Sequence, residues 1–440
     1  MTDLVRKFNS ALRWNMLESI WYKAILTVHQ FGFFWAATPL IYGFSSIIFA
    51  LVYLIVEIIG FGFDRTTAQY SGFYFSDKHS FQLFFLPQLI IHLISTGLIA
   101  SLIWYFHPRL NLILAQNFGH PEFVSLPPNI WFLITAIIFC EVIRKSARML
   151  GQLFFINKPA AILEMGLILL YIVYFWSAFL ISHQISLYTV FVPLLAQSVI
   201  GFAVLFVLLR RKFSDIIYQD CAQDTDLSWS RILQARKLNF FYQLSEMPFG
   251  SNFLIYFLSL IIGVVKIGQV KLANYLAVFI KTLLERSLGL ASLASMASAS
   301  RLPKLQRQLF DLAQRKLYFL LGSLSGIFLL VISAYLLTSH FNWQSTIMLA
   351  LLFFGFTLIN NFFIIYEQFL IIQHQIRFLL FANVIALALT ATIYYKADSI
   401  NPFLLLAWLT ALRMLTFLFI RYKTAPSSTS RYDGEERTKD

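Results

Sequence analysis

Charged residues, cysteine, glycine and proline are all scarce in this chain. Charged residues make up 12% of its 440 residues, and there are 18 glycines, 12 prolines and two cysteines. Soluble domains carry about 25% charged residues, so the composition argues against a soluble enzyme and a disordered chain. So few glycines and prolines exclude a collagen-like fold. Cys140 and Cys221 provide neither a disulfide framework nor the spacing of a zinc site.

Hydrophobic residues take the place of the missing charges. They make up 59% of the chain, phenylalanine alone occurs 47 times, and the mean hydropathy is +0.71. The apolar residues form long unbroken runs, such as 40–63, and not the alternating ten-residue segments of a β-barrel. Since a membrane-spanning helix needs about 20 mostly apolar residues, the sequence predicts an all-α integral membrane protein.

The apolar runs predict twelve transmembrane helices. The predicted spans are 20–38, 40–62, 81–105, 127–144, 160–182, 186–209, 246–267, 272–299, 317–338, 345–369, 378–396 and 401–422. A long polar stretch after the sixth span indicates two six-helix bundles. We therefore predict an N-terminal bundle (1–210), a cytoplasmic connecting segment (211–245), a C-terminal bundle (246–423) and a disordered cytoplasmic tail (424–440). Residues 228–244 of the connecting segment predict an amphipathic helix at the membrane surface.

The basic residues indicate how these spans are oriented. Most of the 34 lysines and arginines fall in segments on one side of the predicted membrane, whereas Arg109, Lys271 and Lys396 fall in loops on the other side. Because cytoplasmic loops carry the excess of basic residues, both termini are predicted to be cytoplasmic. The net charge of +13 then reflects membrane orientation, and nucleic acid is not an expected partner.

Ionisable side chains inside the predicted spans are candidates for function. Each costs about 2.5 to 3.5 kcal/mol at a helix centre and so marks a site by default. The basic candidates are Lys23, Lys266, Lys281, Arg286 and Arg413. The acidic ones are Glu57, Glu141, Glu164, Glu246, Glu285 and Glu367.

Each of these residues also has a structural interpretation. Lys281 and Glu285 are four residues apart and could neutralise each other on one helix face, and Arg413 could pair with Glu367. Lys23 and Lys266 could extend to the headgroups.

The acidic residues leave further alternatives open. Glu57 is either an ion-coupling carboxylate or the partner of a neighbouring base. Asp64 could close a gate by pairing with Arg144 or Arg301, although a solvated pair with Arg65 is the simpler interpretation. No pair of histidines has the spacing of metal ligands on a helix, so neither a metal nor a cofactor is expected.

Several short patterns carry a family resemblance. They are Pro39, Tyr42-Gly43 and Gly60 in the stretch 36–70, the small-residue run that follows Gly268 to Tyr275, and the stretch from Tyr366 to Phe417 with its Gln375-Ile376-Arg377. The chain thereby resembles Wzx-type lipid-linked oligosaccharide flippases of the multidrug/oligosaccharidyl-lipid/polysaccharide (MOP) exporter superfamily. Ala37 stands where that family usually has a leading glycine. The resemblance implies a twelve-helix fold whose central cavity opens to either side in turn.

The resemblance also implies where the substrate binds. In that family, basic residues of the first, second, seventh and eighth spans are thought to face the cavity and hold the pyrophosphate. Lys23, Lys266, Lys281 and Arg286 match three of these spans, and the second span has no basic residue. Lys281 and Arg286 lie five positions apart, or about 140° around a helix. We therefore expect only one of them to face the cavity centre, and favour Arg286 because arginine can grip phosphate with two parallel hydrogen bonds.

The function predicted is that of a flippase, not an enzyme. It would move a polyprenyl-pyrophosphate-linked oligosaccharide across the cytoplasmic (inner) membrane by alternating access, with membrane lipid and other polysaccharide-assembly proteins as candidate partners. One alternative is another MOP exporter, such as a small-molecule or drug antiporter, for which a more acidic cavity is expected. The second is a membrane-embedded glycosyltransferase, polysaccharide polymerase or ligase, although the longest outer loop offers no recognisable acid–base pair.

Overall fold

The computed structural model describes most of the chain and is helical throughout the part that it describes. That part comprises residues 2–75, 78–118, 126–217, 228–262, 270–271, 274, 279–299, 302–338, 344–395 and 402–423. All twelve predicted spans overlap described helices, so the all-α prediction is confirmed. Lys266, Arg301 and the tail 424–440 lie outside the described residues.

The first half of the chain contains nine α-helices and one short π-helical segment within the described residues. They are α1 (Thr2–Ala36), α2 (Pro39–Ile59), α3 (Phe63–Tyr74), α4 (Lys78–Ser80), η1 (Phe81–Phe85), α5 (Leu86–Tyr105), α6 (His107–Phe118), α7 (Pro128–Leu153), α8 (Asn157–Ser182) and α9 (Leu187–Ile217). Several extend well past the predicted spans. The polar N-terminal residues continue the helix of the first span, and α7 runs nine residues beyond the predicted end at 144.

The second half is also built of helices where it is described. Its described elements are α10 (Trp229–Glu246), the 3-10 segment η3 (Met247–Phe249), α11 (Ser251–Ile262), the π-helical segment η4 (Glu285–Gly289), α13 (Leu290–Ser298), α14 (Pro303–Thr338), α15 (Gln344–Ile372), α16 (Ile376–Tyr395) and α17 (Pro402–Lys423). Helical residues 279–284 lead directly into η4.

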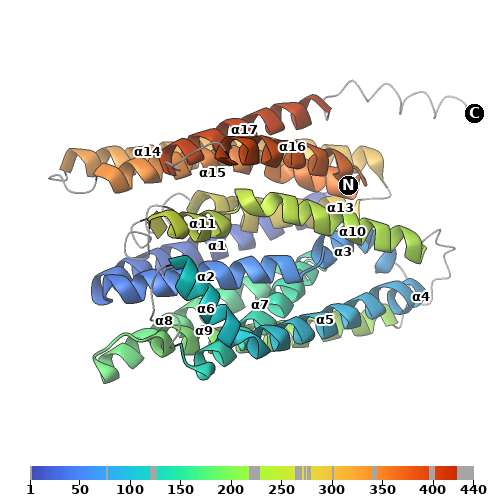
Figure 1. Cartoon of the computed structure of the whole chain (residues 1–440). Helices are drawn as coiled ribbons and strands as arrows, with labels where there is room; N and C mark the ends of the chain where they lie inside the picture. The colour runs from blue at the N-terminus through green and yellow to red at the C-terminus, as the bar shows by residue number, and fades with distance from the viewer. Residues whose placement is uncertain are drawn as a thin grey trace, which may run out of the picture.

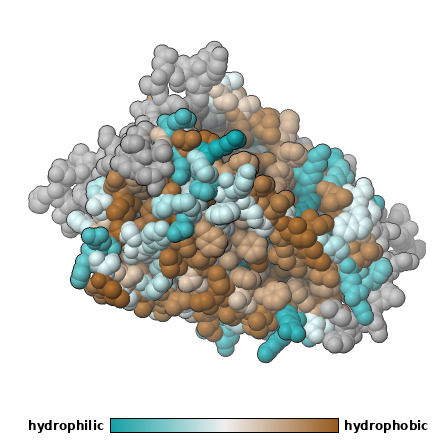
Figure 2. Space-filling view, turned by 60° about the horizontal axis from the view of Figure 1, so that its bottom comes forward, coloured by the Kyte–Doolittle hydropathy of each residue, from teal (hydrophilic) through white to brown (hydrophobic). Residues whose placement is uncertain are grey.

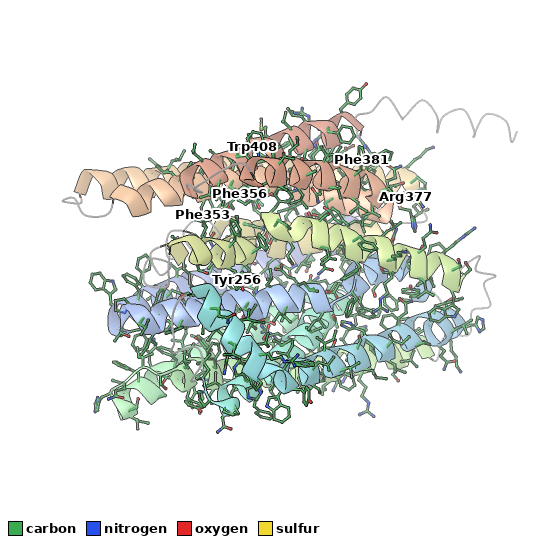
Figure 3. All side chains as sticks on the ribbon, viewed as in Figure 1. Tyr256, Phe353, Phe356, Arg377, Phe381 and Trp408 are labelled. Atoms are coloured by element: carbon green, nitrogen blue, oxygen red, sulfur yellow. The ribbon has the colours of Figure 1, made fainter. Side chains whose placement is uncertain are left out.

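The helices lie nearly parallel and form layers (Figure 1). Helices α1, α2, α7, α8 and α9 pack against one another, α14 to α17 form a second group, and α10, α11 and α13 lie between the two groups. The beginning of α1 and the end of α17 lie at the same end of the molecule, where Arg377 also lies near the start of α16 (Figure 3). This arrangement agrees with the prediction that both termini are on one side of the membrane.

Local sequence signals set the breaks between helices. Thr38 caps α2 by accepting a hydrogen bond from the amide of Ile41 at 3.3 Å, and Pro39 fits the first helical position because it lacks an amide hydrogen. Gly62, between α2 and α3, has a left-handed φ of 69°. A Cβ there would lie 2.7 Å from the carbonyl oxygen of Arg236 in α10, so only glycine permits this close crossing.

The outer faces carry the apolar residues that a membrane protein exposes to lipid. Figure 2 shows a broad hydrophobic area on one face of the molecule. Exposed residues of α5, α8 and α9 contribute large apolar side chains, among them Ile94, Leu98, Val173, Ile181 and Phe206. Six stretches of described helix are long and apolar enough to cross a membrane by length and composition alone: Pro39–Tyr74, Lys78–Tyr105, Asn157–Ser182, Leu187–Ile216, Leu351–Ile372 and Leu404–Tyr422.

The segment expected to lie on the membrane surface takes a different position. Residues 229–246 form α10, which packs against α3 and α16 and lies between the two groups of helices. Its buried face includes Ile232, Asn239 and Tyr242. The side chain of Asn239 donates to the Thr66 hydroxyl of α3 at 2.9 Å. The apolar stripe of this amphipathic helix therefore meets protein, because the neighbouring helices offer it a matching surface.

Candidate functional site

A central cavity of about 360 Å³ opens among α1, α2, α7, α8, α9, α11 and the helical residues around η4. This volume is within the range of small-molecule sites. Its wall includes five basic side chains (Lys23, Arg144, Lys271, Lys281 and Arg286) and three acidic ones (Glu57, Glu141 and Glu285). The cavity wall is therefore rich in charge, and basic residues outnumber acidic ones.

Six of the ionisable residues singled out by the sequence meet at this cavity, Glu141 and Glu285 among them. Lys23 of α1, Glu57 of α2, and Lys281 and Arg286 around η4 all line it, although their positions span more than half the chain. Lys281 and Arg286 both line the cavity. That only one of them faces its centre stays a prediction.

Arg286 is held against α1. Its guanidinium lies 4.4 Å from the ring centroid of Tyr22, and its Nη1 donates to Oε1 of Glu18 at 3.3 Å. Lys281 pairs with Glu285 at 3.4 Å on its own helix, as the spacing predicts. Both predicted substrate ligands thus already have carboxylate partners in this structure.

Arg286 belongs to a larger set of paired charges. Three arginines of α7 and η4 meet three glutamates of α1, α7 and α8; we call this set the α7 network, and it consists of Arg144, Arg148, Arg286, Glu18, Glu141 and Glu164. Arg144 donates to Glu141 at 2.9 Å and to Glu164 at 3.1 Å. Arg148 pairs with Glu18. Equal numbers of acids and bases make this network electrically balanced, which offsets the cost of burial.

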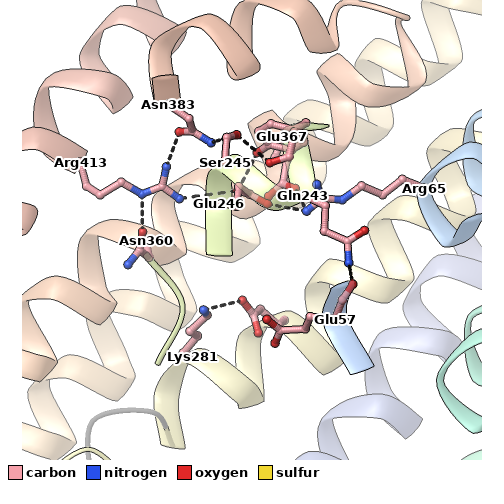
Figure 4. Close-up of polar contacts among 12 residues, drawn as sticks. Glu57, Arg65, Gln243, Ser245, Glu246, Lys281, Asn360, Glu367, Asn383 and Arg413 are labelled. Atoms are coloured by element: carbon pink, nitrogen blue, oxygen red, sulfur yellow. Dashed lines mark hydrogen bonds and ion pairs between the residues drawn. The ribbon is translucent and has the colours of Figure 1, made fainter. Parts of the chain in front are cut away.

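A second balanced set lies where α3, α10, α15 and α17 meet (Figure 4). It consists of Arg65, Glu246, Glu367 and Arg413, and we call it the junction cluster. Arg65 donates to Glu246 and lies 2.8 Å from Glu367. Arg413 lies 3.6 Å from Glu246, and its guanidinium also donates to the Oδ1 atoms of Asn360 at 2.7 Å and of Asn383 at 2.8 Å.

The junction cluster corrects two predictions. The expected partner of Arg413, Glu367, pairs with Arg65, and Arg413 pairs with Glu246, because the end of α10 brings Glu246 within reach of both arginines. The solvated Asp64–Arg65 pair is also wrong. Arg65 reaches across to α10 and α15, and Asp64 accepts a hydrogen bond from the hydroxyl of Ser146 at 2.7 Å.

Glu57 joins α2 to α10 and α11. Its carboxylate accepts a hydrogen bond from Asn252 at 3.5 Å, and its main-chain oxygen accepts one from Gln243 (Figure 4). The carboxylate therefore lies at the boundary between the two halves of the chain and also lines the cavity. A role in ion coupling stays a prediction.

Lys271 lies in the cavity wall and not in the outer loop that the sequence predicts, and it is only 4% exposed. Its Nζ lies 4.8 Å from the ring centroid of Phe49 and 5.5 Å from that of Tyr42. Within the described part of the chain, Nζ has no hydrogen-bond or ion-pair partner. No signal in the sequence separates this lysine from an ordinary loop residue.

Other polar atoms of the cavity are also without partners among the described residues. They are Oδ1 of Asn274 and Nε2 of Gln197, both buried. A smaller pocket of about 10 Å³ adjoins this region, and Phe353 and Phe356 of α15 line it (Figure 3). The described residues contain no group of three or more His, Cys, Asp or Glu side chains that could hold a metal ion.

No protein-family model and no curated protein sequence matches this chain. Solved structures do match it over nearly its whole length. A mutant of the MATE transporter VcmN of Vibrio cholerae has a TM-score of 0.69 at 13% identity, with 97% of this chain and 98% of that chain covered. The eukaryotic MATE transporter AtDTX14 has a TM-score of 0.62 at 14% identity, with 98% and 99% covered.

The fold is that of MATE transporters. A MOP superfamily transporter from Pyrococcus furiosus also shares it, with a TM-score of 0.61 at 13% identity and coverage of 94% and 95%. The MATE fold contains twelve transmembrane helices in two bundles, so this chain is a multi-pass membrane protein. The three solved structures named here are all transporters.

Proposed function

We propose that this chain is an exporter that moves an anionic substrate through its central cavity by alternating access. The observation that carries the proposal is the charge of the cavity wall. Five basic side chains face three acidic ones there; Glu164 and Glu18 behind the wall also pair with Arg144 and Arg286, whereas the buried amine of Lys271 has no counter-charge among the described residues. A buried excess of positive charge is costly unless a ligand supplies the opposite charge. An anionic group would therefore be stabilised in this cavity, whereas a cation would be repelled.

The substrate class we propose is a polyprenyl-pyrophosphate-linked oligosaccharide, carried across the cytoplasmic membrane. Three features support it. The sequence patterns resemble those of Wzx-type flippases, the MATE fold is used by exporters of the MOP superfamily, and the cavity combines basic residues with aromatic and amide side chains. Tyr22, Tyr53, Gln30 and Asn252 line it and offer surfaces suited to sugar rings and hydroxyl groups.

A neighbouring structure supports the emphasis on cavity charge. The Pyrococcus furiosus transporter is described as having a binding pocket of reverse polarity that suggests a different function within the superfamily. A basic cavity in the present chain would favour anionic substrates for the same electrostatic reason.

The second candidate is a cationic small molecule. It is favoured by the acidic wall residues Glu57 and Glu285 and by the fold, since one structure that shares it is a multidrug resistance MATE transporter. Glu285, however, is already paired with Lys281 at 3.4 Å, and Glu57 accepts a hydrogen bond from Asn252. These contacts reduce the negative potential that a cation would require.

A reconstitution experiment separates the two candidates. The full-length protein is placed in liposomes that contain a fluorescent polyprenyl-pyrophosphate disaccharide, and a quencher added outside reports the probe that has crossed the bilayer. We expect protein-dependent translocation of this probe and no efflux of a cationic dye such as ethidium. Efflux of the dye without movement of the lipid-linked probe would contradict the proposed function.

A further inference from the structure

Three basic residues of the cavity wall form ion pairs with glutamates of the protein. Arg144 pairs with Glu141 and Glu164, Arg286 with Glu18, and Lys281 with Glu285. Part of their positive charge is therefore already neutralised within the protein. A ligand that binds one of these residues must compete with a carboxylate of the protein.

Lys271 is in a different environment. Its Nζ is buried, lines the cavity, and has neither a carboxylate nor a hydrogen-bond acceptor among the described residues. Among the described residues, only the rings of Phe49 and Tyr42 lie within cation–π range, at 4.8 Å and 5.5 Å. An ammonium group held by aromatic rings retains its full capacity to donate three hydrogen bonds to an anion.

Two neutral groups complete the surroundings. Asn274, three residues after Lys271 in the sequence, lines the same cavity. Its Oδ1 lacks a donor and Nε2 of Gln197 on α9 lacks an acceptor among the described residues. A hydroxyl group is both a donor and an acceptor, so sugar hydroxyls would satisfy both atoms.

From this arrangement we infer that Lys271 binds the anionic group of the transported molecule, and that Asn274 and Gln197 bind sugar hydroxyls next to it. This inference rests on the proposed function and replaces Arg286 by Lys271 as the principal anion ligand. The ligand class is a glycosyl pyrophosphate. Lys271 supplies a point charge that follows the anion as the helices move, which suits a group that must be released on the other side.

Binding measurements on the purified full-length protein test the inference. Two probes are titrated: inorganic pyrophosphate, and a short-chain prenyl pyrophosphate that carries one sugar. For Lys271→Met we expect the affinity for both probes to fall at least about 30-fold, because truncating one partner of a buried charge pair has effects of this size. Lys271→Arg keeps the charge and should retain most of the affinity.

A control and a second variant sharpen the test. Lys158 also lies over an aromatic ring, Trp14 at 5.4 Å, but is exposed, so Lys158→Met should bind both probes as the wild type does. Asn274→Ala should weaken binding of the sugar-bearing probe and leave binding of inorganic pyrophosphate unchanged. Thermal melting of each variant establishes that it is folded.

The outcomes separate this inference from the proposed function. A folded Lys271→Met protein that binds both probes as tightly as the wild type would overturn the role of Lys271 and leave the proposed function standing. Lys271-dependent binding of inorganic pyrophosphate without binding of the prenyl-linked probe would support the anion site and contradict the lipid-linked substrate. A wild-type protein that binds neither probe would contradict both.

Discussion

The junction cluster and the central cavity bury charge in opposite ways. In the junction cluster, two arginines face two glutamates, and each arginine contacts at least one carboxylate. In the cavity, basic residues outnumber acidic ones, and the buried amine of Lys271 contacts only aromatic rings among the described residues. A structural contact between helices requires balanced charge. Unbalanced buried charge indicates a binding site for a ligand of the opposite charge.

The difference in charge balance corresponds to where the junction cluster and the cavity lie in the molecule. The junction cluster connects α3 of the first half with α10, α15 and α17 of the second half. In alternating access, the two halves must separate on one side while they close on the other. Ion pairs between the halves can form and break without changing the net charge, whereas the proposed function assigns the excess charge of the cavity to an anionic substrate.

The largest expected effect comes from breaking the junction cluster. Arg65→Met leaves Glu246 and Glu367 with only Arg413, and we expect the protein to lose about 3 to 5 kcal/mol of stability because a buried carboxylate becomes uncompensated. Chemical denaturation in detergent measures the loss. Adding Glu367→Gln should restore part of it, and Arg6→Met, at an arginine side chain that is 84% exposed, should change nothing measurable. A single Arg65→Met variant of wild-type stability would show that the cluster is not a coupled unit.

A steric change should disturb the α7 network less strongly. A Cβ on Gly201 of α9 would lie 2.6 Å from Cδ of Arg144 and 3.0 Å from Cδ1 of Leu167. Arg144 cannot move freely because Glu141 and Glu164 hold its guanidinium, so Gly201→Ala should cost about 1 to 3 kcal/mol through overpacking. The same denaturation measurement checks it, with Gly166→Ala as control, since nothing lies within 4 Å of a Cβ there. Equal stability of the two variants would contradict the tight packing around Arg144.

Arg286 offers a test of how much a paired cavity residue contributes to transport. Arg286→Ala should reduce translocation strongly without loss of the protein from the membrane, because the cavity loses one positive charge and Glu18 keeps only Arg148. Arg286→Lys should retain part of the activity, since the charge remains while the planar guanidinium that stacks on Tyr22 is lost. The liposome assay compares the two variants. Normal translocation by a well-expressed Arg286→Ala protein would remove Arg286 from the substrate path.

The smallest effect is expected at Glu285. Its side chain is 47% exposed, and its pair with Lys281 at 3.4 Å is therefore partly solvated. Glu285→Gln should change the free energy of unfolding by less than about 1 kcal/mol, as for other partly exposed pairs. It should also leave the choice between anionic and cationic probes unchanged. A switch toward cations would show that Glu285 sets the polarity of the cavity.

Much of the fold could be predicted from the sequence, because long apolar runs identify membrane-spanning helices. Six cavity residues were also accessible to sequence reasoning, since a charge inside an apolar run is conspicuous: Lys23, Glu57, Glu141, Lys281, Glu285 and Arg286. The spacing also indicated Glu285 as the partner of Lys281, whereas the partner of Arg286 could not be predicted. Glu18 precedes the predicted first span, but α1 begins at Thr2 and carries it into the bundle.

Helices that extend beyond the predicted spans also explain why the positions of residues near helix ends were predicted wrongly. Arg148 lies beyond the predicted end of its span, yet α7 continues to Leu153 and brings it to Glu18. Lys271 stands between two apolar runs, which is the typical position of a loop lysine. Which of these end residues turn inward depends on the packing of helices that are distant in the chain, and hydropathy contains no information about that packing.

The most direct test of the contrast between balanced and unbalanced charge is the ligand-free stability of two variants measured side by side. Removal of a paired base should destabilise the protein, whereas removal of a base without a counter-charge should not. We therefore predict that Arg65→Met lowers the apparent melting temperature in detergent and that Lys271→Met leaves it unchanged or raises it, as is common where a binding site stores unfavourable charge. A fall in melting temperature for Lys271→Met as large as that for Arg65→Met would contradict the account.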